Sequence, residues 1–210
     1  ESRGLGDVYK RQGDYTSPSG PGHDPGLAKR LLAEAGYPGG NGFPADFEYL
    51  FNSSPLNKNI AVELQHMWRE TLGIQVKLRQ AEHKVYLAAQ SSLDYHITRS
   101  SWIGDYNDPN TFLDMFMARN GNNRTGWANA DYDQLIRFAN ATPDLAKRNG
   151  LFRQAETILI ANELPIAPLF FYVGINIYDP DRIGGIHPNI LDIHPVNAIH
   201  TIKPGQPVKK

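Results

Sequence analysis

The chain is predicted to fold as an α/β protein, because helical and strand-like patterns alternate along its first half. Amphipathic helical patterns and short apolar runs follow one another between residues 24 and 102. That order is typical of a largely parallel sheet whose strands are joined by helices. The apolar fraction of 40% and the charged fraction of 20% are those of an ordinary globular protein with a hydrophobic core.

The first helix is predicted over residues 24–35. Asp24 can cap its amino end, Pro25 suits the first helical position, and Gly36 ends it. A loop rich in Gly and Pro leads to residues 47–51, where alternation and aromatic side chains indicate a strand.

The second helix is predicted over residues 55–72, with apolar residues at helical spacing and Gly73 as its stop. Apolar and polar residues alternate over 74–79, which indicates a second strand. A short helix over 84–90 and a strand over 95–102 complete the alternating part. These elements together predict one α/β lobe.

Beyond residue 105 the pattern changes. A polar loop at 119–129 precedes predicted helices at 132–140 and 143–162, the second with an apolar face turned inward. Residues 169–178 form a strongly β-prone run, and the tail after them is rich in turn residues. Several aromatic residues are expected to pack in the core or to mark a protein-binding surface: Tyr106, Phe112, Phe116 and Trp127.

Four parts are therefore expected along the chain. Residues 1–23 are predicted to be a non-native or disordered leader and linker, because 6–12 resemble translated adapter sequence and a Gly/Pro/Ser stretch follows. Ordered protein is expected from Asp24, with an α/β lobe over 24–105. Residues 106–204 form a helical and strand region, and 205–210 a disordered tail.

Composition excludes several function classes. The formal net charge of −1 does not favour a nucleic-acid or anionic-lipid partner. No apolar run approaches the length of about 20 residues that a bilayer-spanning helix needs. The absence of cysteine excludes disulfides, zinc–thiolate sites and thiol nucleophiles.

The junction between the two regions carries the chemistry that suggests a function. An indole at Trp102 and a carboxylate at Asp105 are together a suitable receptor for an ammonium group, and Arg99 can hold a carboxylate. A zwitterionic ligand such as a peptide fits this set. Each residue also has a structural alternative: core packing for Trp102, a turn or helix cap for Asp105, and a surface ion pair for Arg99.

Metal and catalytic sites are not predicted. A metal site at His187, His194 and His200 is conceivable, but their spacing matches no compact motif. His66 and Glu63 share a helix face without the second histidine of a metalloprotease. No nucleophile-elbow or phosphate-loop pattern occurs. We therefore predict no catalytic residue, metal or cofactor, with a His/Asp-based hydrolase as an alternative.

A combination of short motifs extends over residues 24–204. They are Trp102-x-x-Asp105-Tyr106-x-x-Pro109, Phe112-Leu113, Asn122-Asn123, Tyr132-Asp133, Arg148 with Ala155-Glu156, Pro165-Ile166-x-Pro168-Leu169, Gly184-Gly185 and Asp192-x-His194-Pro195. The combination resembles the oligopeptide-binding proteins of ABC transporters, which are family 5 extracellular solute-binding proteins. It is similar to the C-terminal part of such a protein.

The resemblance implies a fold and a function. The fold is an α/β lobe like that of a periplasmic binding protein, with a mixed sheet and a C-terminal segment that returns to the other lobe, so that the fold in this chain is incomplete. The function is that of a monomeric, non-enzymatic receptor, in the periplasm or at the cell surface and lipid-anchored in some members. It captures short peptides and delivers them to a permease with its ATPase subunits. Alternatives are a peptide sensor without transport and a receptor for a cationic or metal-chelate solute.

The resemblance also implies roles for individual residues. Asp105 pairs with the α-amino group of a peptide, and Trp102 forms a wall of a side-chain pocket. The backbone from Ser101 to Ile103 is a strand edge that pairs with the ligand backbone. Asn122 lies near the ligand, and Arg99 receives the C-terminal carboxylate of some peptides.

Two positions depart from the family pattern. Gln90 stands where some relatives carry arginine, and His83 where they carry an aromatic residue. Peptide length and side-chain preference therefore stay open, while capture of the amine at Asp105 is expected to be retained.

Overall fold

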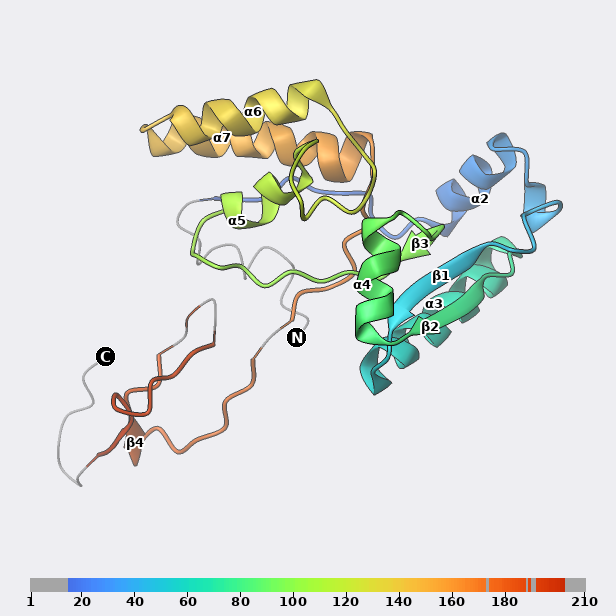
Figure 1. Cartoon of the computed structure of the whole chain (residues 1–210). Helices are drawn as coiled ribbons and strands as arrows, with labels where there is room; N and C mark the ends of the chain where they lie inside the picture. The colour runs from blue at the N-terminus through green and yellow to red at the C-terminus, as the bar shows by residue number, and fades with distance from the viewer. Residues whose placement is uncertain (1–14, 173, 188, 190–191, 203–210) are drawn as a thin grey trace.

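The computed structural model describes residues 15–202 except 173, 188, 190 and 191 (Figure 1). An α/β group contains α2 (Pro25–Glu34), η1 (Pro38–Gly40), β1 (Glu48–Asn52), α3 (Pro55–Leu72), β2 (Lys77–Ala81), α4 (His83–Ser91) and β3 (Ile97–Thr98). A helical group contains α5 (Asn110–Leu113), η2 (Asp114–Phe116), α6 (Ala130–Ala141), α7 (Leu145–Thr157) and the π-helical turn η3 (Ile158–Asn162). A C-terminal arm with β4 (Ile183–Gly184) and β5 (His200–Thr201) extends away from both groups.

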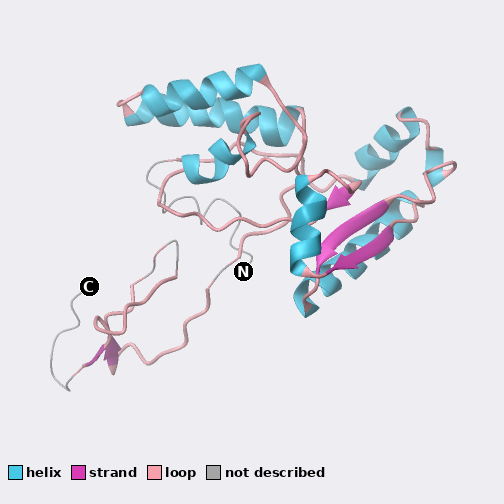
Figure 2. Ribbon diagram, viewed as in Figure 1, coloured by secondary structure: helices cyan, strands magenta, loops and turns pink. Residues whose placement is uncertain are grey.

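The three strands of the α/β group are parallel, in the order β2-β1-β3, as Figure 2 shows. The chain passes from β1 through α3 to β2, and then through α4 to the other side of β1. The two helices consequently cover opposite faces of the sheet. Tyr49 and Phe51 pack with Ala61 of α3, whereas Leu50 packs with Tyr86 of α4. In such sheets ligands bind at the carboxyl ends of the strands, where the strand order reverses.

The predicted helices of this group are confirmed. Asp24 caps α2 by accepting a hydrogen bond of 2.8 Å from the backbone N–H of Leu27. Ser54 caps α3 in the same way, and Gly73 ends that helix at the predicted position with a φ of 73°. Helix α4 begins one residue before its predicted start, because Glu82 accepts hydrogen bonds from the first N–H groups.

The strands are shorter than the sequence pattern predicts. Ile74 and Val76 are buried, but the ladder with β1 begins only at Lys77. The strand predicted over 95–102 is reduced to Ile97–Thr98. Its ladder stops because the carbonyl of Arg99 accepts hydrogen bonds from side chains of α4. The chain therefore leaves the sheet at this point.

The helical group has a core of its own. Helices α6 and α7 place Tyr132, Ile136 and Phe152 in it, each fully buried. The hydroxyl of Tyr132 donates a hydrogen bond of 2.6 Å to the carbonyl of Leu113 and so attaches α5 to the pair. The helix predicted over 143–162 is present as α7 and η3 together.

The expected linker before Asp24 is corrected by the structure from residue 15 onward. Tyr15 is 2% exposed in the core of the helical group, and its hydroxyl donates a hydrogen bond to Glu156. Gly20 then passes close to the carbonyl of Ile160. Tyr15 is therefore part of the helical core, whereas residues 19–24 are exposed, and residues 1–14 lie outside the described residues.

The strongly β-prone run over residues 169–178 forms no strand in its described part. Ile175 and Ile177 are 80% and 94% exposed, and no strand among the described residues lies beside the run to supply hydrogen bonds. A β-prone sequence forms a strand only where such a partner is available. The predicted disordered tail at 205–210 lies outside the described residues.

The first prediction concerns Gly73. Its φ is positive, and a Cβ there would lie closer than 3.0 Å to the carbonyl oxygen of Gly39. We expect Gly73→Ala to lower the free energy of unfolding by about 1–3 kcal/mol in urea denaturation. Gly150 lies in α7 with open space around it, so Gly150→Ala is the control and is expected to be neutral or stabilising. Equal losses in the two variants would contradict the prediction.

The second prediction concerns Glu156, which is 7% exposed. Burial raises its pKa above the ordinary value of 4.5, and the hydrogen bond from Tyr15 opposes this in part. The folded state thus holds the proton more tightly than the unfolded chain, and the free energy of unfolding decreases as the pH rises from 4.5 through the raised pKa. Glu156→Gln keeps an acceptor for Tyr15 but cannot ionise, so we expect it to flatten this decrease.

Urea denaturation at several pH values between 4.5 and neutrality measures the effect. The exposed Glu34→Gln is the matched control and should keep the wild-type profile. A Glu156→Gln profile with the wild-type slope would show that the buried carboxyl does not control this range.

Candidate functional site

The candidate site begins where β3 ends. Past Arg99 the chain is neither helix nor strand and runs from the α/β group toward α5. Trp102 is 37% exposed and Ile103 is 72% exposed. Within the described part of the chain, the backbone groups of Ser101, Trp102 and Ile103 make no hydrogen bond. This stretch is therefore an open backbone edge beside an accessible indole.

Asp105 lies at the end of this edge with an exposed side chain. Its carboxylate forms no ion pair with any residue in the described ranges. The neighbouring acid Asp108 differs, because Arg148 binds both of its carboxylate oxygens, one of them at 2.8 Å. Asp105 is therefore the acid of this turn that is left available to an external cation.

The carboxylate of Asp114 lies close enough to Asp105 for the charge of Asp105 to affect the pKa of Asp114. Burial raises the pKa of Asp114, and the negative charge of Asp105 raises it further, while a hydrogen bond from Asn110 opposes both. The two acids therefore create a negative potential that favours an ammonium group over an anion.

Arg99 contacts the segment that follows the helical group. Its Nη2 donates a hydrogen bond of 2.5 Å to the hydroxyl of Tyr172, and its guanidinium lies 6.0 Å from the centre of that ring. The hydroxyl of Tyr49 is buried and has no hydrogen-bond partner among the described residues. Burial raises the pKa of Tyr49 to about 12, an effect that the positive charge of Arg99 opposes. Arg99 has five N–H donors, so donors remain for a ligand carboxylate.

Asn122 is exposed in the polar loop and is not brought into contact with Asp105 or Trp102 by any hydrogen bond among the described residues. The next residue, Asn123, organises the loop. Its amide donates to the carbonyls of Phe116 and Trp127, each at 3.0 Å. The loop thus has a fixed shape that leaves the side chain of Asn122 facing solvent.

Gln90 connects this loop to the end of β3. Its amide nitrogen donates to the carbonyl of Arg99 at 3.1 Å, and its oxygen accepts a hydrogen bond of 3.1 Å from Arg124. Sequence reasoning noted Gln90 only as a departure from the family pattern. It did not find the roles of Arg124 or Tyr172, for which a single sequence carries no signal.

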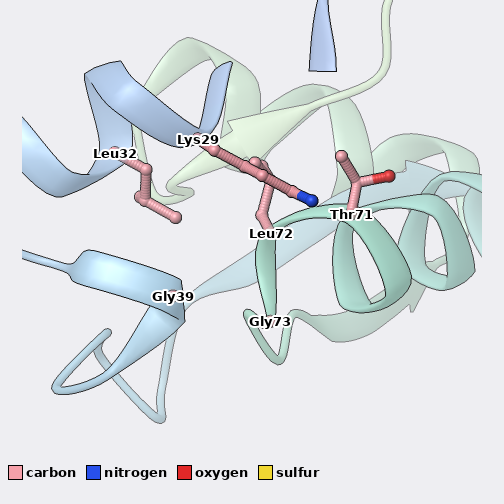
Figure 3. Close-up of a pocket in the computed structure, with 6 residues that line it drawn as sticks. All are labelled: Lys29, Leu32, Gly39, Thr71, Leu72 and Gly73. Carbon is pink, nitrogen blue, oxygen red and sulfur yellow. The ribbon is translucent and has the colours of Figure 1, made fainter. Parts of the chain in front are cut away.

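A separate cavity of about 320 Å³ lies between α2, η1 and the carboxyl end of α3 (Figure 3). It is lined by Lys29, Leu32, Gly39, Thr71, Leu72 and Gly73. Because β2 starts just after α3 ends, the cavity is at the amino ends of the strands. It is consequently not part of the site at Asp105.

The histidines of the arm do not form a metal site within residues 15–202 as far as the structure describes them. His194 and Asp192 are 2.9 Å apart, and Asn176 donates a hydrogen bond of 2.7 Å to the same carboxylate. The hydrogen bond with His194 is the main reason why the pKa of Asp192 is lowered. This exposed pair is the structural basis of the His/Asp alternative.

Among the described helices, none is long and apolar enough to cross a bilayer.

Residues 6–124 match the sequence profile of the bacterial extracellular solute-binding proteins, family 5, middle region. The chain belongs to this family. It is 38% identical to the oligopeptide-binding protein OppA of Bacillus subtilis over 149 residues, which cover 70% of this chain and 27% of OppA. It is 36% identical over 159 residues to YgiS of Escherichia coli, described as a probable deoxycholate-binding periplasmic protein, covering 76% of this chain and 29% of YgiS.

Solved structures of family 5 proteins share the fold. The oligopeptide-binding protein OppAIV of Borrelia burgdorferi superimposes with a TM-score of 0.72 at 33% identity, over 90% of this chain and 38% of that protein. The predicted α/β class and the incomplete fold are confirmed by this match. The chain spans about three tenths of the length of these curated relatives, 27% of one and 29% of the other.

Proposed function

We propose that the complete protein is the substrate-binding component of an ABC importer and that it captures short peptides outside the cytoplasm. It delivers them, as a monomer and without catalysis or a cofactor, to a permease with its ATPase subunits. The observation that carries this proposal is the exposed Asp105 carboxylate, which has no cation partner within the described residues and follows the exposed indole of Trp102. Several relatives, including OppA, are named as oligopeptide-binding proteins, and this supports a peptide as the ligand.

In this proposal the α-ammonium group of the peptide binds Asp105. The main chain of the peptide pairs with the open edge from Ser101 to Ile103, which provides affinity that does not depend on side chains. Trp102 forms one wall of a side-chain pocket. Arg99 receives a C-terminal carboxylate, and Asn122 contacts the ligand when the polar loop is covered.

Enclosure of the ligand strengthens the contact at Asp105. Both charges are then taken out of water, and the attraction between them increases as the local dielectric constant falls. Removing one partner from such a buried pair leaves the other unpaired and typically costs about 2–5 kcal/mol. A single carboxylate can therefore select peptides by their free amino end.

Two alternatives make different predictions about ligand chemistry. A family member that binds a sterol acid, which the description of YgiS suggests, would not be expected to place an unpaired carboxylate beside its ligand, because the ligand is itself an anion. A hydrolase at Asp192 and His194 needs a nucleophile, and Asn176 is the side chain that contacts the pair in the described part of the arm. A peptide sensor shares the site and differs only in its downstream partner.

The third prediction tests amine capture. In the complete gene product, we expect Asp105→Ala to weaken binding of trialanine by about 2–5 kcal/mol, at least about thirtyfold in Kd. Isothermal titration calorimetry measures the change. Asp46→Asn, an exposed acid before β1, is the control and should bind like the wild type. Unchanged trialanine affinity in Asp105→Ala, or tight binding of deoxycholate by the wild type, would refute the proposed function.

The fourth prediction tests the open backbone edge. Ile103 has an exposed side chain, so we expect Ile103→Ala to change peptide affinity less than threefold, or about 0.7 kcal/mol. Ile103→Pro removes the backbone N–H and is expected to weaken binding about fivefold to tenfold, since one main-chain hydrogen bond is lost. Isothermal titration calorimetry with trialanine provides the readout, and thermal unfolding confirms that both variants are folded. Equal affinities of the two variants would argue against pairing through this N–H.

A further inference from the structure

Asp105 is held by a residue six positions later in the chain. Its backbone N–H donates a hydrogen bond of 3.0 Å to Oγ1 of Thr111. Thr111 is 3% exposed, so this bond is shielded from water. The preceding Gly104 is also buried, and a Cβ there would lie 2.9 Å from the ring of Phe112 and 3.1 Å from the methyl group of Thr111. The backbone on both sides of the Asp105 amide is thus seated against the start of α5.

The start of α5 is itself fixed. Asp108 accepts a hydrogen bond of 2.9 Å from the backbone N–H of Asn110, and its carbonyl accepts one of 3.2 Å from that of Thr111. The same carboxylate is bound by Arg148, whose guanidinium lies 4.6 Å from the ring centre of Phe152 in the helical core. Thr111 therefore stands on a turn that is anchored to α7.

The side chain of Asp105 has no such support. No hydrogen bond or ion pair to its carboxylate is present within the described residues. The position of the carboxylate therefore depends on the backbone that carries it and on its side-chain rotamer, and that backbone is held by the contact with Thr111. The nearby Asp114 is a second acid, and the pKa of Asp114 is raised mainly by its burial and to a smaller extent by the negative charge of Asp105.

We propose that Thr111 is the positioning residue for the amine-binding carboxylate. The inference rests on the proposed function of Asp105 and adds that the selectivity for a free amino end depends on the buried hydroxyl of Thr111. Thr111 does not contact the ligand. It keeps the backbone of Asp105 in one orientation, so that the carboxylate is directed at the ammonium group before the ligand arrives.

The test compares Thr111→Val with Thr111→Ser in the complete gene product. Valine keeps the shape of threonine but leaves the Asp105 N–H without an acceptor, whereas serine keeps the acceptor. We expect Thr111→Val to weaken binding of trialanine about fivefold to tenfold, the scale of one buried hydrogen bond. Affinity for N-acetyl-trialanine should change less than twofold, and Thr111→Ser should bind both peptides within about twofold of the wild type.

Three outcomes would overturn the proposal: unchanged trialanine affinity in Thr111→Val, equal losses for the two peptides, or no rescue by serine. If Thr111→Val does not fold, Gly104→Ala provides the second test. Its Cβ displaces Phe112 and Thr111 while the hydroxyl is kept, and the same selective loss for trialanine is expected. An unchanged ratio of the two affinities in that variant would also overturn the proposal.

Asp105→Asn separates this inference from the proposed function. If Asp105→Asn binds trialanine like the wild type, the amine site itself is wrong. If Asp105→Asn loses affinity and Thr111→Val does not, the site stands and only the positioning role of Thr111 fails.

Discussion

The ion pair between Arg148 and Asp108 is the interaction on which the geometry of the candidate site depends. It joins α7, which places Phe152 and Ala155 in the core of the helical group, to the turn that carries Asp105. The two side chains are 18% and 25% exposed, so water screens the pair only in part. Asp108 uses the same carboxylate to cap α5. One acid thereby attaches the end of an irregular segment to a rigid core, and the segment needs no secondary structure of its own.

The parts of the fold that the sequence predicts best are those whose cause is local. The bounds of α3 follow from Ser54, Pro55 and Gly73, which lie at its two ends and act on backbone groups a few residues away. The strands were predicted less well because a strand is defined by a partner. The alternation at Ile74 and Val76 correctly indicates burial, yet it contains nothing about where the ladder with β1 begins.

The candidate site shows the same difference between features with a local cause and features that depend on residues distant in the sequence. The chemistry of Asp105 and Trp102 could be predicted from residue types. The structure exposes both side chains, and their contact with a ligand stays a prediction. Three contacts could not be predicted, because they join residues that are distant in sequence: Arg99 with Tyr172, Gln90 with Arg124, and Arg148 with Asp108. Tyr15, expected in a linker, was missed for this reason too, since its partner Glu156 is 141 positions away. Thr111 is the exception, because an Asp-Pro turn followed by threonine is a local signal that sequence reasoning could have used.

The arrangement of charges around the turn suggests why the site is built at the point where the chain leaves the sheet. A carboxylate inside the sheet or at a helix cap would be hydrogen-bonded or ion-paired within the protein, as that of Asp108 is. It would then not be available to bind a ligand. Termination of β3 by Tyr86 and Gln90 produces a backbone edge, and the anchored turn places an acid at its end, neither of which has a partner among the residues that the structure describes. Both features are tolerable only while water solvates them. If the proposed function is right, such a site is stable when open and water-filled, and enclosing it becomes favourable only when a ligand supplies a cation and hydrogen bonds.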